Sequence, residues 1–306
     1  MNIIGKRKIW YAISILMIVP GLISLVMFGL KLGIDFRSGQ LSVVEGNVAT
    51  QTVEEAAKGL GLEDIQVVPS GSNQTQIRFL DPAPQEKHEA NHQKFKAALA
   101  DKGITELSFD SVGPTVSSTI ARNAIISLLL VSLAIVFYIA YAFRNAPPPV
   151  SPWSFGIMAI VALLHDALFI LGVFSLLGHF FDIEIDALFV TAILTTIGFS
   201  VHDTIVVFDR IRENLRREKG DFETIVNHSI LETIARSVNT SVTVMLTLLA
   251  LLLFGGQSIR WFVLALLIGV ASGTYSSIFN ASPLLVSWHN YRLKRLAKAK
   301  ATPKRA

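Results

Sequence analysis

Six long apolar segments restrict what this chain can fold into more than any other feature of its sequence. A helix that crosses a lipid bilayer needs roughly 17–25 predominantly apolar residues. The six segments cover residues 9–30, 122–143, 153–178, 184–207, 238–255 and 259–289. Charged residues make up 16% of the chain, below the roughly 25% of ordinary soluble domains. We therefore predict an α-helical polytopic membrane protein with a six-helix transmembrane bundle.

The first apolar segment follows Lys6-Arg7-Lys8 and so begins like a signal peptide. It is longer than the roughly 7–15 residues of a signal-peptide core, and Leu30-Lys31-Leu32 has no small residues for cleavage. We expect residues 1–30 to be the N-terminus and an uncleaved first membrane helix.

Lys and Arg side chains gather in three places, which predicts the orientation. They lie before the first segment, after the fourth segment at 210–219, and in the basic tail at 292–306. With six spans these places fall on one side of the membrane, and short loops rich in Lys and Arg stay in the cytoplasm. Both termini are therefore expected to be cytoplasmic.

A polar stretch at 31–120 separates the first two apolar segments and is expected to form a domain outside the cytoplasm. It has eight basic and twelve acidic residues, a net charge of 8 − 12 = −4. This balance argues against specific nucleic-acid binding. The expected elements are a strand near Ile34–Val44, a helix near Thr52–Gly59 capped by Thr50 or Thr52, strands at Ile65–Val68 and Thr75–Phe79 joined by a turn at 69–73, a helix at Pro82–Lys102 with Phe95 and Leu99 on one face, and a strand at Glu106–Val112. This β-α-β-β-α-β order predicts a small α+β ferredoxin-like domain.

The remaining helices, two to six, are expected within 121–291. Inside that region, residues 208–236 have balanced charges and apolar residues at helical spacing. Such a pattern is typical of an amphipathic segment on a membrane surface. We predict a separate cytoplasmic segment there, with Arg236 at the start of the fifth membrane helix.

Asp203 is the strongest candidate for a functional residue, because it lies within an apolar segment. An acidic side chain at the centre of a membrane helix costs about 2.5–3.5 kcal/mol on insertion scales. Burial favours its protonated form, whereas a nearby arginine favours the carboxylate. We predict that Asp203 is a functional residue and that it pairs with Arg236. The alternatives are a structural hydrogen bond for Asp203 and an Arg236 that only extends to the membrane interface.

Three further ionisable side chains lie in apolar segments. His202 precedes Asp203, and His165-Asp166 lies near the centre of the third segment. These residues can belong to a proton path or to polar packing, and the sequence leaves both open. Small residues at 269–277 can let helices approach closely, within the chain or against a partner, and the former is favoured.

Several kinds of chemistry are excluded by missing residues. The chain has no cysteine, hence no disulfide, thiolate metal site or cysteine nucleophile. It also lacks HExxH and GxSG motifs and a presenilin-type aspartate pair, which argues against an intramembrane protease. We expect no enzyme activity, metal site or cofactor.

Motifs along the whole chain resemble those of the SecD/SecF family of protein translocase subunits, within the resistance–nodulation–division superfamily. The matching segments are Gly33–Gly39 (GIDFRSG), Ser111–Pro114 (SVGP), Ala162–Asp166 (ALLHD), Phe199–Asn214 (FSVHDTIVVFDRIREN), Arg236–Ser241 and Gly273–Leu285 (GTYSSIFNASPLL). The chain departs from the family pattern where glycine is usual at Ser38 and Ser117, asparagine at His202 and isoleucine at Asn280.

This resemblance implies a fold, a function and partners. The fold is half of a resistance–nodulation–division transporter in a bacterial inner membrane, with residues 31–120 periplasmic. The function is proton-gradient-driven assistance to late protein export, with Asp203 and Arg236 as the proton-coupling residues. The implied partners are SecD, which supplies a further aspartate to the proton path, the SecYEG channel, YajC, YidC, unfolded polypeptides in transit and the lipid bilayer. Two other functions stay open, a small-molecule efflux subunit of the same superfamily and a scaffold that only assembles the translocase.

Overall fold

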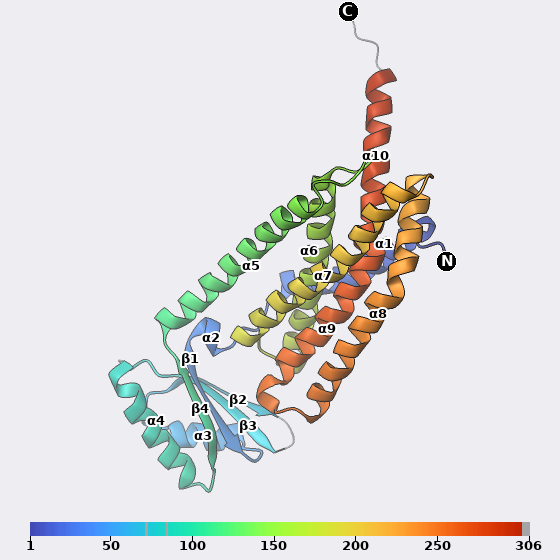
Figure 1. Ribbon diagram of the computed structural model, residues 1–306. Coiled ribbons are helices and arrows are strands. Elements are labelled where there is room, and N and C mark those ends of the chain that lie inside the picture. Colours follow the sequence, from blue (N-terminus) through green and yellow to red (C-terminus); the bar gives the residue numbers. More distant parts are fainter. Residues whose placement is uncertain (71–72, 84, 302–306) are drawn as a thin grey trace, which may run out of the picture. The chain divides into compact units, whose positions relative to one another are not determined.

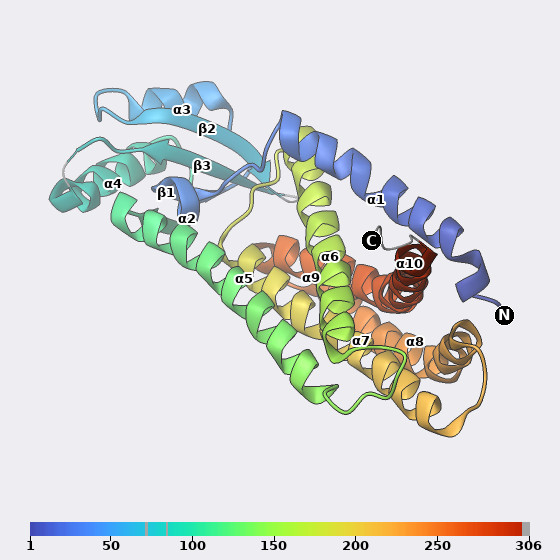
Figure 2. The same cartoon turned by 90° about the horizontal axis from the view of Figure 1, so that it is seen from above.

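The structure, a computed structural model, describes residues 1–70, 73–83 and 85–301 (Figures 1 and 2). The chain forms two compact units. We call the first the helical unit, which comprises Met1–Leu30, Ser127–Leu177 and the chain from Leu188 on. The second, the sheet unit, comprises Lys31–Ile126 and Gly178–Ala187.

The apolar segments form long helices, as predicted. The elements are a 3-10 turn at Ile4–Lys6, α1 (Arg7–Met27), α5 (Pro114–Ala142), α6 (Pro152–Phe181), α7 (Ala187–Arg217), α8 (Phe222–Phe254), a 3-10 turn at Gln257–Ile259, α9 (Arg260–Ser276), a π-helical stretch at Ser277–Ala281, and α10 (Ser282–Ala301). Among the described residues, six helical runs are long and apolar enough to cross a membrane, with α9, the π-helical stretch and the start of α10 counting as one. The predicted number of six spans is confirmed.

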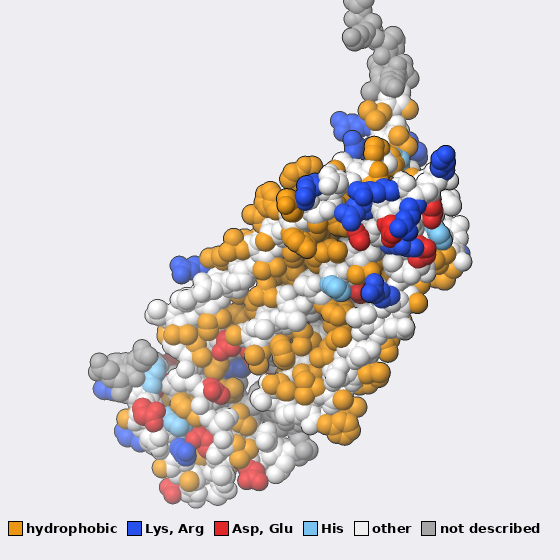
Figure 3. Space-filling view, viewed as in Figure 1, with side chains coloured by type: hydrophobic (Ala, Val, Ile, Leu, Met, Phe, Trp, Pro, Cys, Tyr) orange, Lys and Arg blue, Asp and Glu red, His pale blue; other side chains and the backbone are white. Residues whose placement is uncertain are grey.

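The predicted separate segment at 208–236 is wrong. Helix α7 continues through Arg217, and α8 already begins at Phe222, so Arg236 lies inside α8 and not at its start. Within 208–236 the first strong helix breaker is Gly220. Helix α7 therefore ends just before this glycine, and α8 begins just after it. An ion pair of Arg210 with Glu232 at 2.6 Å joins the two helices. Figure 3 shows charged side chains gathered where α7 and α8 join, beside a mainly hydrophobic helical face.

The sheet unit contains a four-stranded sheet in the order β2-β3-β1-β4, with every neighbouring pair antiparallel. Its elements are α2 (Ile34–Arg37), β1 (Gly39–Glu45), α3 (Thr50–Ala57), β2 (Glu63–Ser70), β3 (Gln74–Leu80), α4 (Gln85–Ala100) and β4 (Glu106–Val112). The predicted β-α-β-β-α-β order is therefore present, with the additional helix α2 before β1.

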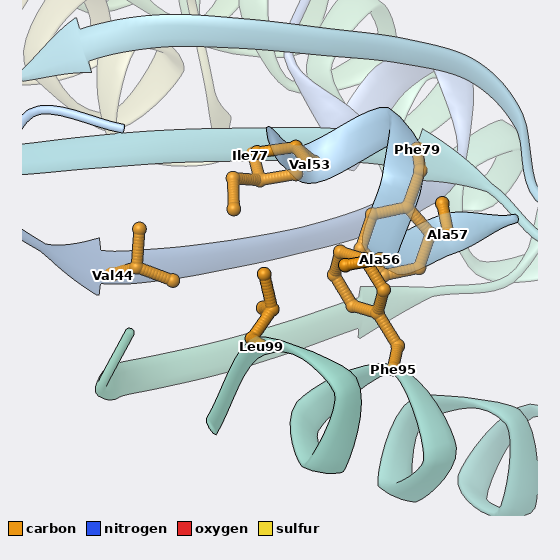
Figure 4. Packing of buried hydrophobic residues seen from close by; sticks show 8 residues of the cluster. All are labelled: Val44, Val53, Ala56, Ala57, Ile77, Phe79, Phe95 and Leu99. Carbon is orange, nitrogen blue, oxygen red and sulfur yellow. The ribbon is translucent and has the colours of Figure 1, made fainter. Parts of the chain in front are cut away.

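One face of this sheet packs against α3 and α4 (Figure 4). Side chains alternate between the faces of a strand, so Ile77 and Phe79 of β3 both point into the core. Phe95 and Leu99 of α4 are at most 1% exposed, and the Phe79 and Phe95 ring centroids are 4.9 Å apart. The predicted inward face of α4 is confirmed.

Two predicted boundaries in the sheet unit are wrong. Ile34–Arg37 is a short helix, and the strand begins only at Gly39. Ser38 separates the two elements because its φ of 64° fits neither a helix nor a strand. Helix α3 begins at Thr50 after Ala49, and neither predicted threonine caps it. Residues 71–72 of the predicted 69–73 turn and residues 302–306 of the basic tail lie outside the described residues.

The link between α6 and α7 is held by the segment that follows α1. Leu32 and Ile185 form a parallel β-bridge, and the Gly33 N–H donates to the Ile185 carbonyl at 2.8 Å. A Cβ at Gly33 would lie 3.0 Å from that carbonyl oxygen, so glycine allows the close approach. Asp35 Oδ2 accepts the backbone N–H of Ala187 at 2.8 Å, which satisfies one of the otherwise unpaired donors at the start of α7.

Candidate active carboxylates of the helical unit

Asp203 lies in the middle of α7 and is 2% exposed. It borders a cavity of about 380 Å³ between α7 and α8. The lining residues are His202, Asp203, Val206, Arg236, Ser237 and Thr240. The three residues that the sequence analysis placed around this carboxyl, Asp203, Arg236 and His202, therefore share one cavity.

Asp203 and Arg236 do not form the expected ion pair. Within the described part of the chain, no salt bridge or hydrogen bond joins them, and Arg236 is exposed beside the cavity. Ser241 of α8 instead donates to Asp203 Oδ2 at 3.3 Å, which is long for a hydroxyl–carboxylate hydrogen bond. His202 is exposed, because neighbouring residues on a helix point about 100° apart. The cavity thus brings Arg236 and His202 near a carboxyl that has one long hydrogen bond.

Asp166 of α6 has a different environment. It is 1% exposed and accepts hydrogen bonds from three serines on two other helices. Ser200 of α7 and Ser276 of α9 donate to Oδ2, each at 2.6 Å, and Ser272 of α9 donates to Oδ1 at 2.7 Å. His165 Nδ1 lies 3.1 Å from Oδ1. An ionised carboxylate has about four acceptor positions, and four donors surround this one.

The contact with Asp166 assigns the proton of a neutral His165. A carboxylate only accepts, so Nδ1 carries the hydrogen and Nε2 is left as an acceptor. The His165 ring lies 6.1 Å from that of Tyr275, centroid to centroid. Tyr275 donates from its hydroxyl to the Trp10 carbonyl of α1 at 2.8 Å. The His165 ring thus contacts the carboxylate of the next residue along the helix, a contact that the sequence analysis did not anticipate.

The two carboxyls are suited to different tasks. Asp166 is surrounded by donors from α7 and α9, and these hydrogen bonds join both helices to α6. Asp203 has one long hydrogen bond, from Ser241, and a cavity beside it.

Small residues let α7 and α9 approach closely enough for these bonds. A Cβ at Gly269 would lie 2.4 Å from the Thr196 side chain, and one at Gly273 would lie 2.9 Å from Ser200 Cβ. The small-residue segment 269–277 therefore packs within the chain, as favoured above. Asn280, a departure from the family pattern, accepts from Ser14 of α1 at 2.9 Å.

The sequence analysis missed the hydroxyl residues that surround the carboxyls. Ser200, Ser241, Ser272, Thr274 and Ser276 look like ordinary small residues of apolar helices. One signal was available, because Ser272 and Ser276 are four residues apart and lie on one helix face. Their partner on α6 was not predictable from spacing. In the described residues, no group of three or more His, Asp or Glu is placed to hold a metal ion.

Comparisons with known proteins agree on one family. A family model described as protein export membrane protein SecD/SecF, C-terminal, matches residues 92–291. The protein translocase subunit SecF of Thermobaculum terrenum is 50% identical over 97% of this chain and 96% of its own length. The SecF of Anaerolinea thermophila is 42% identical over 99% of both chains. The crystal structure of SecDF from Thermus has a TM-score of 0.81 at 31% identity and covers 95% of this chain, which spans 39% of that longer chain.

Proposed function

Because this chain belongs to the SecD/SecF family of membrane proteins for protein export, we propose that it uses the proton gradient to promote a late step of export through the Sec machinery. It belongs with transport accessory subunits and not with enzymes. In this proposal Asp203 binds and releases the proton. The positive charge of Arg236, in the same cavity, favours the ionised form of Asp203. His202, His165 and Asp166 form the polar surroundings.

The observation that carries the proposal is the cavity beside Asp203. It gives a buried carboxyl a route for protons, and it places a cation within the same cavity. A charge that crosses the membrane yields about 2.3 kcal/mol per 100 mV. That energy is enough to shift a two-state equilibrium by more than tenfold, since about 1.4 kcal/mol corresponds to each factor of ten.

An exposed polar surface on α7 and α8 supports a membrane partner. His202, Arg236, Asn239 and Thr240 are exposed. Exposed apolar residues of α8 continue this surface, namely Val238, Val242 and Leu246. Polar side chains that face lipid hydrocarbon cost free energy. A partner helix with an acidic or amide side chain can pack on this surface and satisfy them. SecD is the proposed partner, because the similar SecDF chain is more than twice as long as the part that this chain matches.

The polar ends of the helical unit support the proposed orientation in a bacterial inner membrane. Glu223 at the start of α8 pairs with Arg7 at 3.0 Å and accepts from Asn290 of α10 at 2.6 Å. The beginning of α1 and the middle of α10 therefore meet the start of α8, near the place where the charges gather (Figure 3). Under the positive-inside rule this end faces the cytoplasm, and 31–120 is then periplasmic.

The sheet unit is the proposed contact to the exported chain. Its strand order and antiparallel pairing fit a ferredoxin-like domain, and its net negative charge disfavours nucleic acid. The proposed further partners are SecYEG, YajC, YidC and unfolded polypeptides. A small-molecule efflux subunit is the second candidate, because a membrane cavity lined by ionisable groups serves either cargo.

Export in membrane vesicles tests this proposal. Vesicles containing SecYEG, SecD and either the wild type or Asp203→Asn are compared with and without a proton gradient, after the energy-dependent first stage of export. We expect the variant to assemble and to lose the stimulation by the gradient. Full stimulation in the assembled variant contradicts the proposal and supports a scaffold function. Gradient-driven loss of a small dye without any effect on export supports the efflux candidate.

A further inference from the structure

A chain of two hydroxyls connects Asp203 to α9. Thr274 of α9 donates to Ser241 Oγ of α8 at 2.6 Å, and Ser241 Oγ lies 3.3 Å from Asp203 Oδ2. The Ser241 hydroxyl also has a second acceptor, the Ser237 carbonyl of its own helix, at 2.8 Å. A serine hydroxyl has one proton and two lone pairs. It can therefore satisfy only one of these acceptors at a time.

The protonation of Asp203 decides which acceptor Ser241 uses. An ionised Asp203 only accepts, so the Ser241 proton points to it in a charge-assisted hydrogen bond. A protonated Asp203 donates to Ser241 Oγ, and the Ser241 proton then turns to the Ser237 carbonyl. Ser241 Oγ keeps a lone pair for Thr274 in both arrangements. Thr274 thus holds the serine in place while its proton changes partner.

We propose that Ser241 and Thr274 are positioning residues that favour the ionised form of Asp203 and connect its protonation to α9. The bond from Thr274 strengthens when Ser241 donates to a charged carboxylate, because hydrogen bonds in a row polarise one another. When Asp203 takes up a proton, the bond weakens, and the Val270 carbonyl at 2.9 Å competes for the Thr274 proton.

Helix α9 can pass this change to other helices at the same level. Ser272 and Ser276, on either side of Thr274, donate to Asp166 of α6. The next residue, Ser277, lies 2.8 Å from the Thr204 hydroxyl of α7. A π-helical stretch begins at this residue, and such stretches are frequent at functional sites.

The charged and titratable groups around Asp203 are few. His202 of α7 and Arg236 of α8 face the same cavity. The His165-Asp166 pair of α6 is bonded to Ser200, three residues before Asp203. The titratable group of α9 near this level is Tyr275, which is bonded to α1. Toward Asp203 itself, α9 contributes the hydroxyl of Thr274.

The test rests on the proposed function and uses the pH dependence of gradient-stimulated export in the full SecD-containing complex. Ser241→Ala removes a charge-assisted donor, so we expect half of the stimulation to be reached at a pH about one unit higher, since about 1.4 kcal/mol corresponds to one unit. Thr274→Val, which keeps the shape and removes the hydroxyl, should give a smaller shift in the same direction. Thr274→Ser should restore the wild-type profile.

Thr247→Val is the matched control, because the Thr247 hydroxyl bonds only to the Thr243 carbonyl of its own helix among the described residues. Infrared titration of the purified complex, with Asp203→Asn as the reference for its carboxyl band, gives a second measurement without transport. An unchanged profile and an unchanged band in Ser241→Ala overturn the inference. A Thr274→Ser variant that behaves like Thr274→Val also overturns it, since packing is then the cause. Persistent stimulation in Asp203→Asn refutes the proposed function instead.

Discussion

Arg78 of β3 and Glu184 of the α6–α7 link form a two-bond ion pair in the sheet unit. Arg78 Nη1 contacts Glu184 Oε1, and Arg78 Nη2 contacts Glu184 Oε2. The side chain of Arg78 is 18% exposed and that of Glu184 is 17% exposed. Burial and then the nearby charge of Arg37 lower the pKa of Arg78 from its usual value. The pair therefore fastens the α6–α7 link to β3 in a place where little water reaches it.

Removal of this pair should loosen the link. Glu184→Gln leaves a half-buried cation without its partner, and we expect the free energy of unfolding to fall by about 1–2 kcal/mol. The measurement is thermal unfolding of the purified full chain, with protease cleavage in the link as a local readout. Glu55→Gln is the control, because the Glu55–Lys102 pair is exposed and should contribute little. Equal effects of the two variants contradict the prediction.

Glu106 and the polar side chains around it, Ser42, His92 and Lys96, form a cluster under α4. This cluster should make the sheet unit less stable in acid. Burial alone raises the pKa of Glu106, but hydrogen bonds from Ser42 and His92 outweigh it and hold the pKa below its usual value. The pKa is lower in the folded state, so the stabilisation is present above the unfolded value of about 4.3 and is lost as the pH falls through the folded pKa.

Comparison of the wild type with Glu106→Gln over a pH series tests this prediction. The loss of melting temperature in the variant should be largest at neutral pH and should shrink in acid. His92 and Lys96 are the cations that face Glu106, at 2.9 and 3.4 Å. A difference between the two proteins that grows in acid contradicts the assignment.

The protein should become more stable when Ser38 is replaced by glycine. The Ser38 φ of 64° and ψ of 166° lie in a region that is almost restricted to glycine. We expect Ser38→Gly to raise the free energy of unfolding by about 1 kcal/mol, net of the larger entropy of the unfolded glycine chain. Ser111→Gly in β4 is the matched control and should lower it by roughly 0.5–1 kcal/mol. Chemical denaturation of the full chain measures both variants, and a loss of stability in Ser38→Gly is the contrary outcome.

The close approach of α7 and α9 should not tolerate a methyl group. Gly273→Ala places a Cβ 2.9 Å from Ser200 Cβ, which pushes apart the helices that hold Asp166. We expect a loss of about 1–3 kcal/mol and weaker assembly with SecD. Gly198→Ala, on α7 with nothing within 4 Å of its Cβ, should be neutral or stabilising because alanine favours helices. Similar melting temperatures for the two variants argue against this packing.

The sequence by itself determined the elements with strong local signals. Six apolar segments become six membrane-length helices, because a bilayer leaves few alternatives to a helix. The strand at Thr75–Phe79 and the inward face of α4 were also predictable, from alternation and helical spacing. Boundaries were less accurate wherever one residue with an unusual φ, such as Ser38, or a continued helix, such as α7, decided them.

Only the tertiary structure decided which polar groups meet. Asp203 and Asp166 look alike in the sequence, as acids in apolar helices. One ends beside a cavity with a long bond to Ser241, and the other receives donors from serines up to 110 positions away. No periodicity relates residues so far apart, because their meeting depends on how whole helices pack. The sequence thus determined where acidic residues lie within apolar segments, and the packing of α6 to α9 decided which side chains surround each carboxyl.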